Sequence, residues 1–348
     1  MKKTILSYLI FILLFIVPSF SQENQEEKSA PLKGVFVVGT VQNTALIQTA
    51  TIWKDGQARH LSDGTKNTWA TSVFIVDDIA WIAGYQAHGD EPSVALLWKN
   101  ADVMRLTDGK RDSVASSVFV SDGDVYVVGY ETNEEDKAVA MLWKNGYPQH
   151  LSNGKRSAYA KSVFVSGKTV YVVGHEYNDA DKPVATLWTN GRQRSIGGAG
   201  SAAKSIFVSD SNTYIAGYET NTQENTYATV WKNGSTRLRL TNGDSQAEAS
   251  AVYVSGSDIY AVGYDSKYNK DGNHVAVLWK NRIAQILGDL TKHSMAESIF
   301  VVDQTIYVAG FEDIKEEAAT PIVWKNSTPL YRLPLGDFLA DSIAVFVK

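Results

Sequence analysis

Apolar and polar positions follow one pattern that returns about every 45 residues along most of the chain. Each copy contains a tryptophan that follows Ile, Leu or Val and precedes Lys or Thr. These tryptophans lie 43 to 48 residues apart, at Trp53, Trp98, Trp143, Trp188, Trp231, Trp279 and Trp324. A glycine lies 14 residues before the tryptophan in six copies and 16 residues before it in the remaining one, at Gly39, Gly84, Gly129, Gly174, Gly217, Gly263 and Gly310. A fixed period of this length is the sequence signature of a repeat architecture.

Within each copy, side chains alternate with the period of two that is typical of β-strands. Turn-forming pairs such as Asp122-Gly123 and Asn145-Gly146 separate the alternating segments. In the third copy this pattern predicts four strands, over residues 117–121, 125–130, 138–144 and 148–151. Both faces of the third strand are apolar, because alanine and an aliphatic residue lie opposite the tryptophan. Both faces must therefore be covered, as they are in blades stacked around an axis.

The two ends of the repeat region complete each other. The first copy begins at Val35 with its second strand, and residues 340–345 resemble residues 296–301, the first strand of the seventh copy. We therefore predict an all-β fold, a seven-bladed β-propeller with four antiparallel strands per blade, whose C-terminal strand completes the first blade. The register of that strand stays open, since either Ala344 or Phe346 can take the place of Phe300.

The N-terminal residues have the pattern of a secretory signal peptide. Two lysines precede an apolar run over residues 5–17, and the small Ser19 and Ser21 follow it. We expect residues 1–21 to be a cleaved signal peptide, 22–32 a disordered lead-in and 33–348 the propeller, with an uncleaved anchor as the alternative. The mature protein would then be secreted or periplasmic and have no stable membrane anchor.

Composition narrows the chemistry further. The chain has no cysteine, which excludes disulfides, a lipid-modified cysteine and cysteine metal sites. Without Lys2 and Lys3, 31 Lys and Arg face 38 Asp and Glu, a net charge near −7. That balance disfavours nucleic acid as a partner. We expect a monomer that binds a protein or a glycan.

The repeat strings carry a resemblance. The period and layout are distantly similar to WD-repeat and kelch propellers, although the Gly-His to Trp-Asp pairing and the kelch Gly-Gly doublet are absent. Strings such as Ser-Val-Phe-Val, Val-Tyr-Val-Val-Gly-Tyr-Glu and Leu-Trp-Lys-Asn-Gly more closely resemble secreted bacterial seven-bladed propeller repeat proteins. The resemblance covers residues 33–348. It implies the fold and no established activity.

Features that every copy shares serve folding, whereas features that differ between copies can form a single site. The tryptophans are therefore read as core, with sugar-stacking platforms as the alternative. Each first strand also begins Ala-x-Ser or close to it, as in Ala115 and Ser117. Close packing at the axis explains this motif, and a hydroxyl-lined channel is the alternative.

The variable loop residues supply the candidate ligand-binding positions. The position two residues after the repeated glycine is mostly acidic, at Glu131, Glu176, Glu219, Asp265 and Glu312. The loops between blades are basic in places, at Lys110, Arg111, Lys155 and Arg156. Two aromatic residues, Trp69 and Tyr159, replace smaller ones beside these loops and could stack on a sugar. The alternative is that opposite charges on neighbouring loops simply pair.

Catalytic signals are weak. No histidine pair has metal-ligand spacing, and neither a nucleophile elbow nor a phosphate-binding glycine loop occurs. We expect no catalytic residue, no metal site and no cofactor, with Ca²⁺ at the acidic loops 178–181 or 269–273 as the alternative.

These observations favour an exported, non-enzymatic binding or interaction scaffold that uses its loop face. The alternatives are a secreted lectin and, as the least favoured, a carbohydrate-active hydrolase or lyase. Several equivalent weak sites would favour the lectin. One acid-lined recess at the axis with raised carboxyl pKa values would favour the enzyme.

Overall fold

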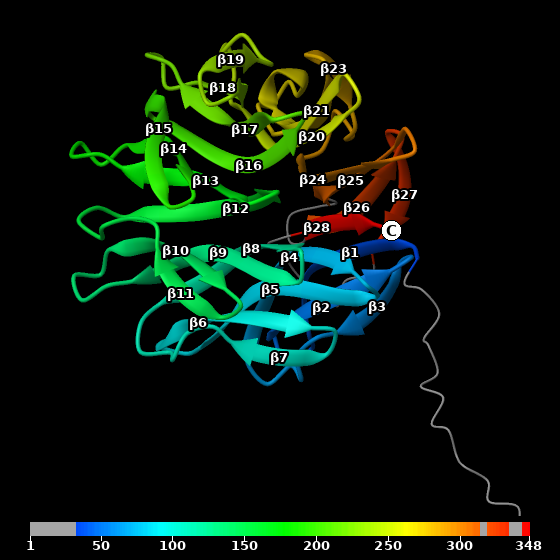
Figure 1. The fold of residues 1–348 in the computed structure, drawn as a ribbon. Coiled ribbons are helices and arrows are strands. Elements are labelled where there is room, and N and C mark those ends of the chain that lie inside the picture. Colours follow the sequence, from blue (N-terminus) through cyan, green and yellow to red (C-terminus); the bar gives the residue numbers. More distant parts are fainter. Residues whose placement is uncertain (1–32, 314–318, 334–342) are drawn as a thin grey trace, which may run out of the picture. The chain divides into compact units, whose positions relative to one another are not determined.

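The structure is a computed structural model that describes residues 33–313, 319–333 and 343–348, so the predicted signal peptide and lead-in lie outside the described residues. Seven four-stranded antiparallel sheets form a ring of blades, which confirms the predicted seven-bladed β-propeller (Figure 1). We number the blades in chain order from the one that contains β1. Within the described residues, no helix is long and apolar enough to cross a membrane.

The strands follow one another in the same order in every blade. The first three blades contain β1 (Val35–Gln42), β2 (Gln48–Lys54) and β3 (Gln57–His60); β4 (Asn67–Val76), β5 (Ile79–His88), β6 (Glu91–Lys99) and β7 (Asp102–Arg105); and β8 (Ser113–Ser121), β9 (Asp124–Thr132), β10 (Ala138–Lys144) and β11 (Tyr147–His150). The fourth and fifth contain β12 (Ala158–Ser166), β13 (Thr169–Tyr177), β14 (Pro183–Thr189) and β15 (Arg192–Ala199); and β16 (Ser201–Ser209), β17 (Asn212–Thr220), β18 (Thr226–Lys232) and β19 (Thr236–Arg239). The last two contain β20 (Ala247–Ser255), β21 (Asp258–Asp265), the short 3₁₀ helix η1 (Ser266–Tyr268), β22 (Ala276–Lys280) and β23 (Ile283–Ile286); and β24 (Ser294–Val302), β25 (Thr305–Asp313), β26 (Ala319–Lys325) and β27 (Thr328–Arg332).

The C-terminal strand β28 (Ile343–Val347) pairs with β1 and completes the first blade, as predicted. In Figure 1 this red strand lies beside the blue β1. Phe346 pairs with Phe36 just as Phe300 pairs with Tyr307, so Phe346 takes the place of Phe300. The structure thereby decides the register that the sequence left open.

Seven tryptophans form the repeated core between blades. Each is at most 1% exposed, which confirms that they are core: Trp53, Trp98, Trp143, Trp188, Trp231, Trp279 and Trp324. Each packs with aliphatic residues of its own blade and of a neighbouring blade, as Trp143 does with Leu97 and Val118. Side chains of this size, fully removed from water, are the main source of stability in a chain without cross-links.

The innermost strands meet around the axis. One aromatic ring from each of them contacts the rings of the two neighbouring blades, with centroids 4.4–5.4 Å apart, and together they form a closed collar: Phe74, Phe119, Phe164, Phe207, Tyr253, Phe300 and Phe346. The repeated serine also links blades, since the Ser117 hydroxyl accepts a hydrogen bond from the Val163 backbone N–H of the next blade at 3.4 Å. The serines thus serve packing at the axis.

The first strand of the third blade begins at Ser113, four residues before the predicted start at 117. A β-bulge between Ala115 and Ser117 is the reason. The bulge inserts one extra residue, Ser116, into the ladder and so interrupts the alternation on which the prediction depended. The same bulge occurs in the second to seventh blades.

Candidate functional site

The β-bulges present one side chain per blade near the axis, on the innermost strands. We call this residue, the x of Ala-x-Ser, the bulge position. It holds Thr71, Ser116, Lys161, Lys204, Ser250 and Glu297 in the second to seventh blades. Bulges re-aim side chains and are frequent at functional sites. Here the bulge residues are charged in the fourth, fifth and seventh blades and uncharged in the second, third and sixth.

The charged bulge residues interact with charged groups of other blades. Lys204 of β16 forms an ion pair with Glu248 of β20. Burial acts to lower the pKa of Lys204, but Glu248 and Glu297 outweigh it, so the pKa is raised. Burial raises the pKa of Glu297 to about 7, with Glu248 acting in the same direction and Lys204 against it. Around neutral pH this carboxyl can therefore exchange a proton.

Lys161, on β12, has no carboxylate within ion-pair distance among the residues that the structure describes. Its ammonium lies 5.6 Å from the centre of the Tyr159 ring. Lys161 is accessible to solvent, but the surrounding blades remove part of its hydration. That loss lowers the pKa of Lys161, and the ammonium of Lys204 lowers it further. Two ammonium groups close together, one of them unbalanced, attract an anion.

Aromatic side chains form a wall beside these charges. Tyr159 packs against Tyr130, His175 and Tyr177, with centroid distances of 4.9, 5.2 and 6.3 Å. Burial lowers the pKa of His175 to about 4, with Lys161 and Lys204 adding to the effect, so the imidazole is neutral at pH 7. Its Nδ1 atom is buried and has no hydrogen-bond partner among the described residues. An unsatisfied buried polar atom in a natural protein calls for an explanation, and a ligand would supply one.

Two further phenols, Tyr218 and Tyr264, interact electrostatically with Glu248. Burial raises the pKa of both phenols, and Glu248 raises it further. We refer to Lys161, Lys204, Glu248 and Glu297, together with His175, Tyr218 and Tyr264, as the axial cluster. It combines cations, carboxyl groups and aromatic faces from the fourth to seventh blades.

Sequence reasoning identified Tyr159, which packs against His175 of the axial cluster, but none of the cluster residues as a candidate ligand-binding residue. The signal was present, because the residue between the repeated alanine and serine differs from copy to copy. Lys161, Lys204 and Glu297 occupy a position that the flanking motif marks as equivalent. Only the bulge shows that this residue leaves the ladder and lies with its counterparts near the axis.

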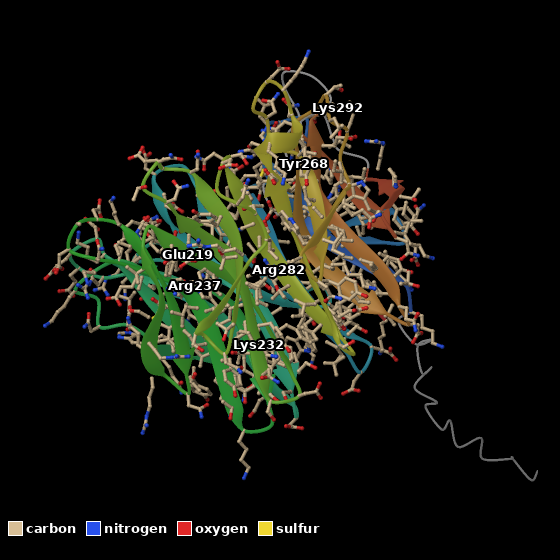
Figure 2. All side chains as sticks on the ribbon, turned by 90° about the horizontal axis from the view of Figure 1, so that it is seen from above. Glu219, Lys232, Arg237, Tyr268, Arg282 and Lys292 are labelled. Carbon is tan, nitrogen blue, oxygen red and sulfur yellow. The ribbon has the colours of Figure 1, made fainter. Side chains whose placement is uncertain are left out.

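Most residues of the predicted acidic ring are buried, so they do not form an exposed surface. Four of its members are at most 9% exposed, at Glu176, Glu219, Asp265 and Glu312. Most are paired with the outer strand of the same blade. Glu219 accepts a hydrogen bond from Arg237 Nε at 2.7 Å (Figure 2), and Glu312 pairs with Arg332. Glu176 pairs with Gln193, whereas Asp265 accepts a hydrogen bond from Ser245 at 2.8 Å. Each pair lies within or beside its own blade, so these side chains do not converge on one site.

Glu131 is the half-buried member of the ring. Burial raises the pKa of its carboxyl, with Asp108 adding to the effect and Arg111 opposing it. It lies on β9 of the third blade, outside the axial cluster.

Three of the four predicted basic loop residues pair with nearby carboxylates. Lys110 lies 2.7 Å from Asp108, and Arg111 lies 2.9 Å from Glu134. Arg156 lies 3.0 Å from Asp179 and 3.5 Å from Glu176. Lys155 is exposed at the same turn. In the second blade, Trp69 stacks on Tyr85 with centroids 4.6 Å apart. These contacts match the alternative in which the loop charges pair.

Metal-binding geometry is absent from the described residues, where no group of three or more His, Asp or Glu side chains is placed to hold an ion. His274 instead stacks on Tyr264 at 3.8 Å and contacts His293 at 4.8 Å. Burial lowers the pKa of His274, and His293 lowers it further.

Comparison with solved structures finds this fold in a puromycin-hydrolysing peptidase of Mycobacterium tuberculosis. The TM-score is 0.57 at 10% sequence identity, over 87% of this chain and 52% of the peptidase chain. This chain thus spans about half the length of that structure. No family model and no curated protein matches the sequence. At such low identity the similarity extends to the fold alone, and it supports a seven-bladed β-propeller.

Proposed function

We propose that this chain is an exported β-propeller that binds a glycan through its axial cluster, with an acidic sugar residue as the recognised group. One observation carries the proposal: Lys161 has no carboxylate within ion-pair distance among the described residues, and the bulge position of the neighbouring blade holds a second ammonium group, that of Lys204. A sugar carboxylate or sulfate would balance that charge, and the ring faces of Tyr159 and His175 suit the apolar face of a pyranose. The buried Nδ1 atom of His175 would gain a hydroxyl donor.

The first test is a glycan array that contains neutral and acidic sugars, probed with residues 22–348 with and without Ca²⁺. We expect acidic sugars to bind. The Lys161→Gln variant should bind them at least tenfold more weakly than wild type does. Because the folded state lowers the pKa of Lys161, removing its charge should not destabilise the fold, so lost binding would not reflect unfolding.

Lys168→Gln is the matched control. Lys168 is an exposed lysine in the turn that follows β12, at the opposite end of the same strand. The Lys168→Gln variant should bind acidic sugars as tightly as wild type does. Neutral sugars binding equally well, or full affinity in Lys161→Gln, would overturn the proposal.

Cleavage of the bound sugar is a second candidate function, which the raised pKa of Glu297 favours. A carboxyl group with a pKa of about 7 can act as general acid at neutral pH. Incubation of each array hit with the protein, followed by chromatography of the sugar, tests for products. Glu297→Gln should abolish any cleavage and keep the binding, whereas unchanged cleavage would remove Glu297 from that role.

A further inference from the structure

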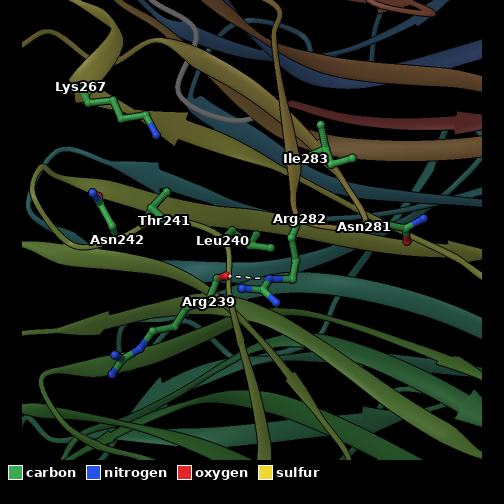
Figure 3. A pocket seen from close by; sticks show the side chains of 8 residues that line it. All are labelled: Arg239, Leu240, Thr241, Asn242, Lys267, Asn281, Arg282 and Ile283. Carbon is green, nitrogen blue, oxygen red and sulfur yellow. Dashed lines mark hydrogen bonds between the residues drawn. The ribbon is translucent and has the colours of Figure 1, made fainter.

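A groove with a volume of about 630 Å³ crosses the outer rim between the fifth and sixth blades, and none of its lining residues belongs to the axial cluster. Its lining includes three cationic side chains and no carboxylate, namely Arg239, Lys267 and Arg282. Figure 3 shows Lys267 and Arg282 on opposite sides of the groove. The chain as a whole has a formal net charge of −5. The groove is therefore a local reversal of charge that attracts anions.

Among these three cations, Arg282 is the one without an ion-pair or ring partner among the described residues. Its Nε atom donates a hydrogen bond to the backbone carbonyl of Arg239 at 3.3 Å, across the boundary between the blades (Figure 3). Within the described residues, no carboxylate lies within ion-pair distance of its guanidinium. The other two cations have partners, because Arg239 stacks on the Tyr227 ring at 3.9 Å and Lys267 lies 3.3 Å from the buried Asp265.

The backbone at Arg282 is unfavourable for an arginine. Asn281 and Arg282 form the turn between β22 and β23, and both have positive φ, at 50° and 72°. Glycine is preferred at the second position of such a turn, and it occurs there at Gly56, Gly146 and Gly191 in three other blades. A side chain that persists against the backbone preference is a reason to look for a function.

An apolar hollow of about 190 Å³ adjoins the groove, and Arg282 lines both. Leu238, Leu240, Ile259 and Trp279 form most of its wall. A protein cavity of about 150 Å³ is large enough to hold a benzene molecule. The hollow therefore has room for one aromatic ring or a short branched chain directly beside the unused charge.

The equivalent hollow between the third and fourth blades provides an internal comparison. Its volume is about 280 Å³, and it has Gly191 at the position of Arg282 and Gln149 at the position of Leu238. The same type of hollow therefore occurs at two boundaries between blades and follows from the repeated fold. Lysines, Lys144 and Lys168, line the hollow of the third and fourth blades. The arginine beside Leu238 and Leu240 belongs to the hollow of the fifth and sixth blades.

We propose that this groove and hollow form a second binding site, which takes a small amphipathic anion. The anionic group lies between Arg282 and Lys267. The apolar part enters the hollow over Leu238, Leu240 and Ile259. The site is independent of the axial cluster, and the proposal does not rest on sugar binding.

Phenyl phosphate is the probe, with inorganic phosphate as the ligand that lacks the ring. Titration calorimetry of the mature chain should show saturable binding of phenyl phosphate, at least tenfold tighter than that of inorganic phosphate. In methyl NMR spectra, resonances of Leu238, Leu240 and Ile259 should shift on binding, because the ring current of the ligand acts over that wall. Absence of saturable binding, equal affinity for the two ligands, or shifts confined to other residues would overturn the proposal.

Arg282→Gly is the decisive variant, because it installs the residue that the turn prefers. The thermal unfolding midpoint should stay the same or rise, while phenyl phosphate should bind at least tenfold more weakly. Arg105→Ala is the control, since Arg105 has the position in β7 that Arg239 has in β19. The Arg105→Ala variant should bind phenyl phosphate as tightly as wild type does. Unchanged affinity in Arg282→Gly would refute the site.

Discussion

Replacement of Glu297 by glutamine should remove a pH-dependent loss of stability. Burial raises the pKa of this carboxyl from 4.5 to about 7, so the folded state holds its proton more tightly than the unfolded state does. Below pH 4.5 both states are protonated, and the group has no effect. Between pH 4.5 and 7 the folded state binds more protons, and the free energy of unfolding therefore falls as pH rises. Glutamine does not titrate, so this fall should be absent from the variant.

The magnitude follows from the two pKa values. Each pH unit between them corresponds to about 1.4 kcal/mol, so the full effect is about 3 kcal/mol. Of this, about 2.5 kcal/mol falls between pH 5 and pH 8 by the same linkage relation. For a propeller of about 300 residues, that difference is about 4 °C in the unfolding midpoint.

Thermal and denaturant unfolding of both proteins at pH 5 and pH 8 measures the effect. Relative to Glu297→Gln, wild type should lose about 2.5 kcal/mol between the two pH values. Glu134→Gln is the control for loss of a carboxylate, because the Glu134 side chain is 87% exposed and lies outside the axial cluster. If the difference between wild type and Glu297→Gln were the same at both pH values, Glu297 would ionise as it does in water. The axial cluster would then not be a desolvated site.

Two further substitutions test the packing. Trp143→Ala should lower the free energy of unfolding by about 3–5 kcal/mol in denaturant titrations, since Trp143 is fully buried between blades, and a loss below 1 kcal/mol would contradict a core role. Phe346→Ala should cost about 2–3 kcal/mol, because the ring is half-buried in the aromatic collar 4.8 Å from Phe300. A near-neutral Phe346→Ala would mean that Ala344 holds this place instead and that the register of β28 is different.

The repeated part of the fold could be predicted from the sequence because every copy contains the same information. The spacing of the tryptophans and glycines, and the resemblance of residues 340–345 to 296–301, lead directly to seven blades and a closing strand. The register of the C-terminal strand β28 could not be predicted, because the resemblance of residues 340–345 to 296–301 aligns Ala344 with Phe300. The structure instead places Phe346 there, where its ring completes the collar.

The candidate site was harder to predict because it depends on contacts between blades and on irregular backbone. The ion pair of Lys204 and Glu248 joins strands of two blades, and the alternation of neither strand reveals it. The acidic ring also depends on contacts that the sequence does not reveal. Glu219 looked like a loop-face charge, but its partner Arg237 is on the outer strand of the same blade, and only the register of β19 brings them together.

The bulge position explains how one site can arise in a molecule of seven similar blades. The residues on either side of it are constrained, because Ala160 is fully buried and the Ser162 hydroxyl accepts the Ile206 backbone N–H. The bulge residue itself is the extra one in the ladder, so its side chain can change without loss of a strand hydrogen bond or of core volume. Charge can therefore accumulate there blade by blade. Lys161, Lys204 and Glu297 lie on the fourth, fifth and seventh blades, and Thr71 and Ser116 keep the second and third uncharged. Among the bulge positions that the structure describes, in the second to seventh blades, this distribution favours a ligand that binds against the fourth to seventh blades rather than the second and third.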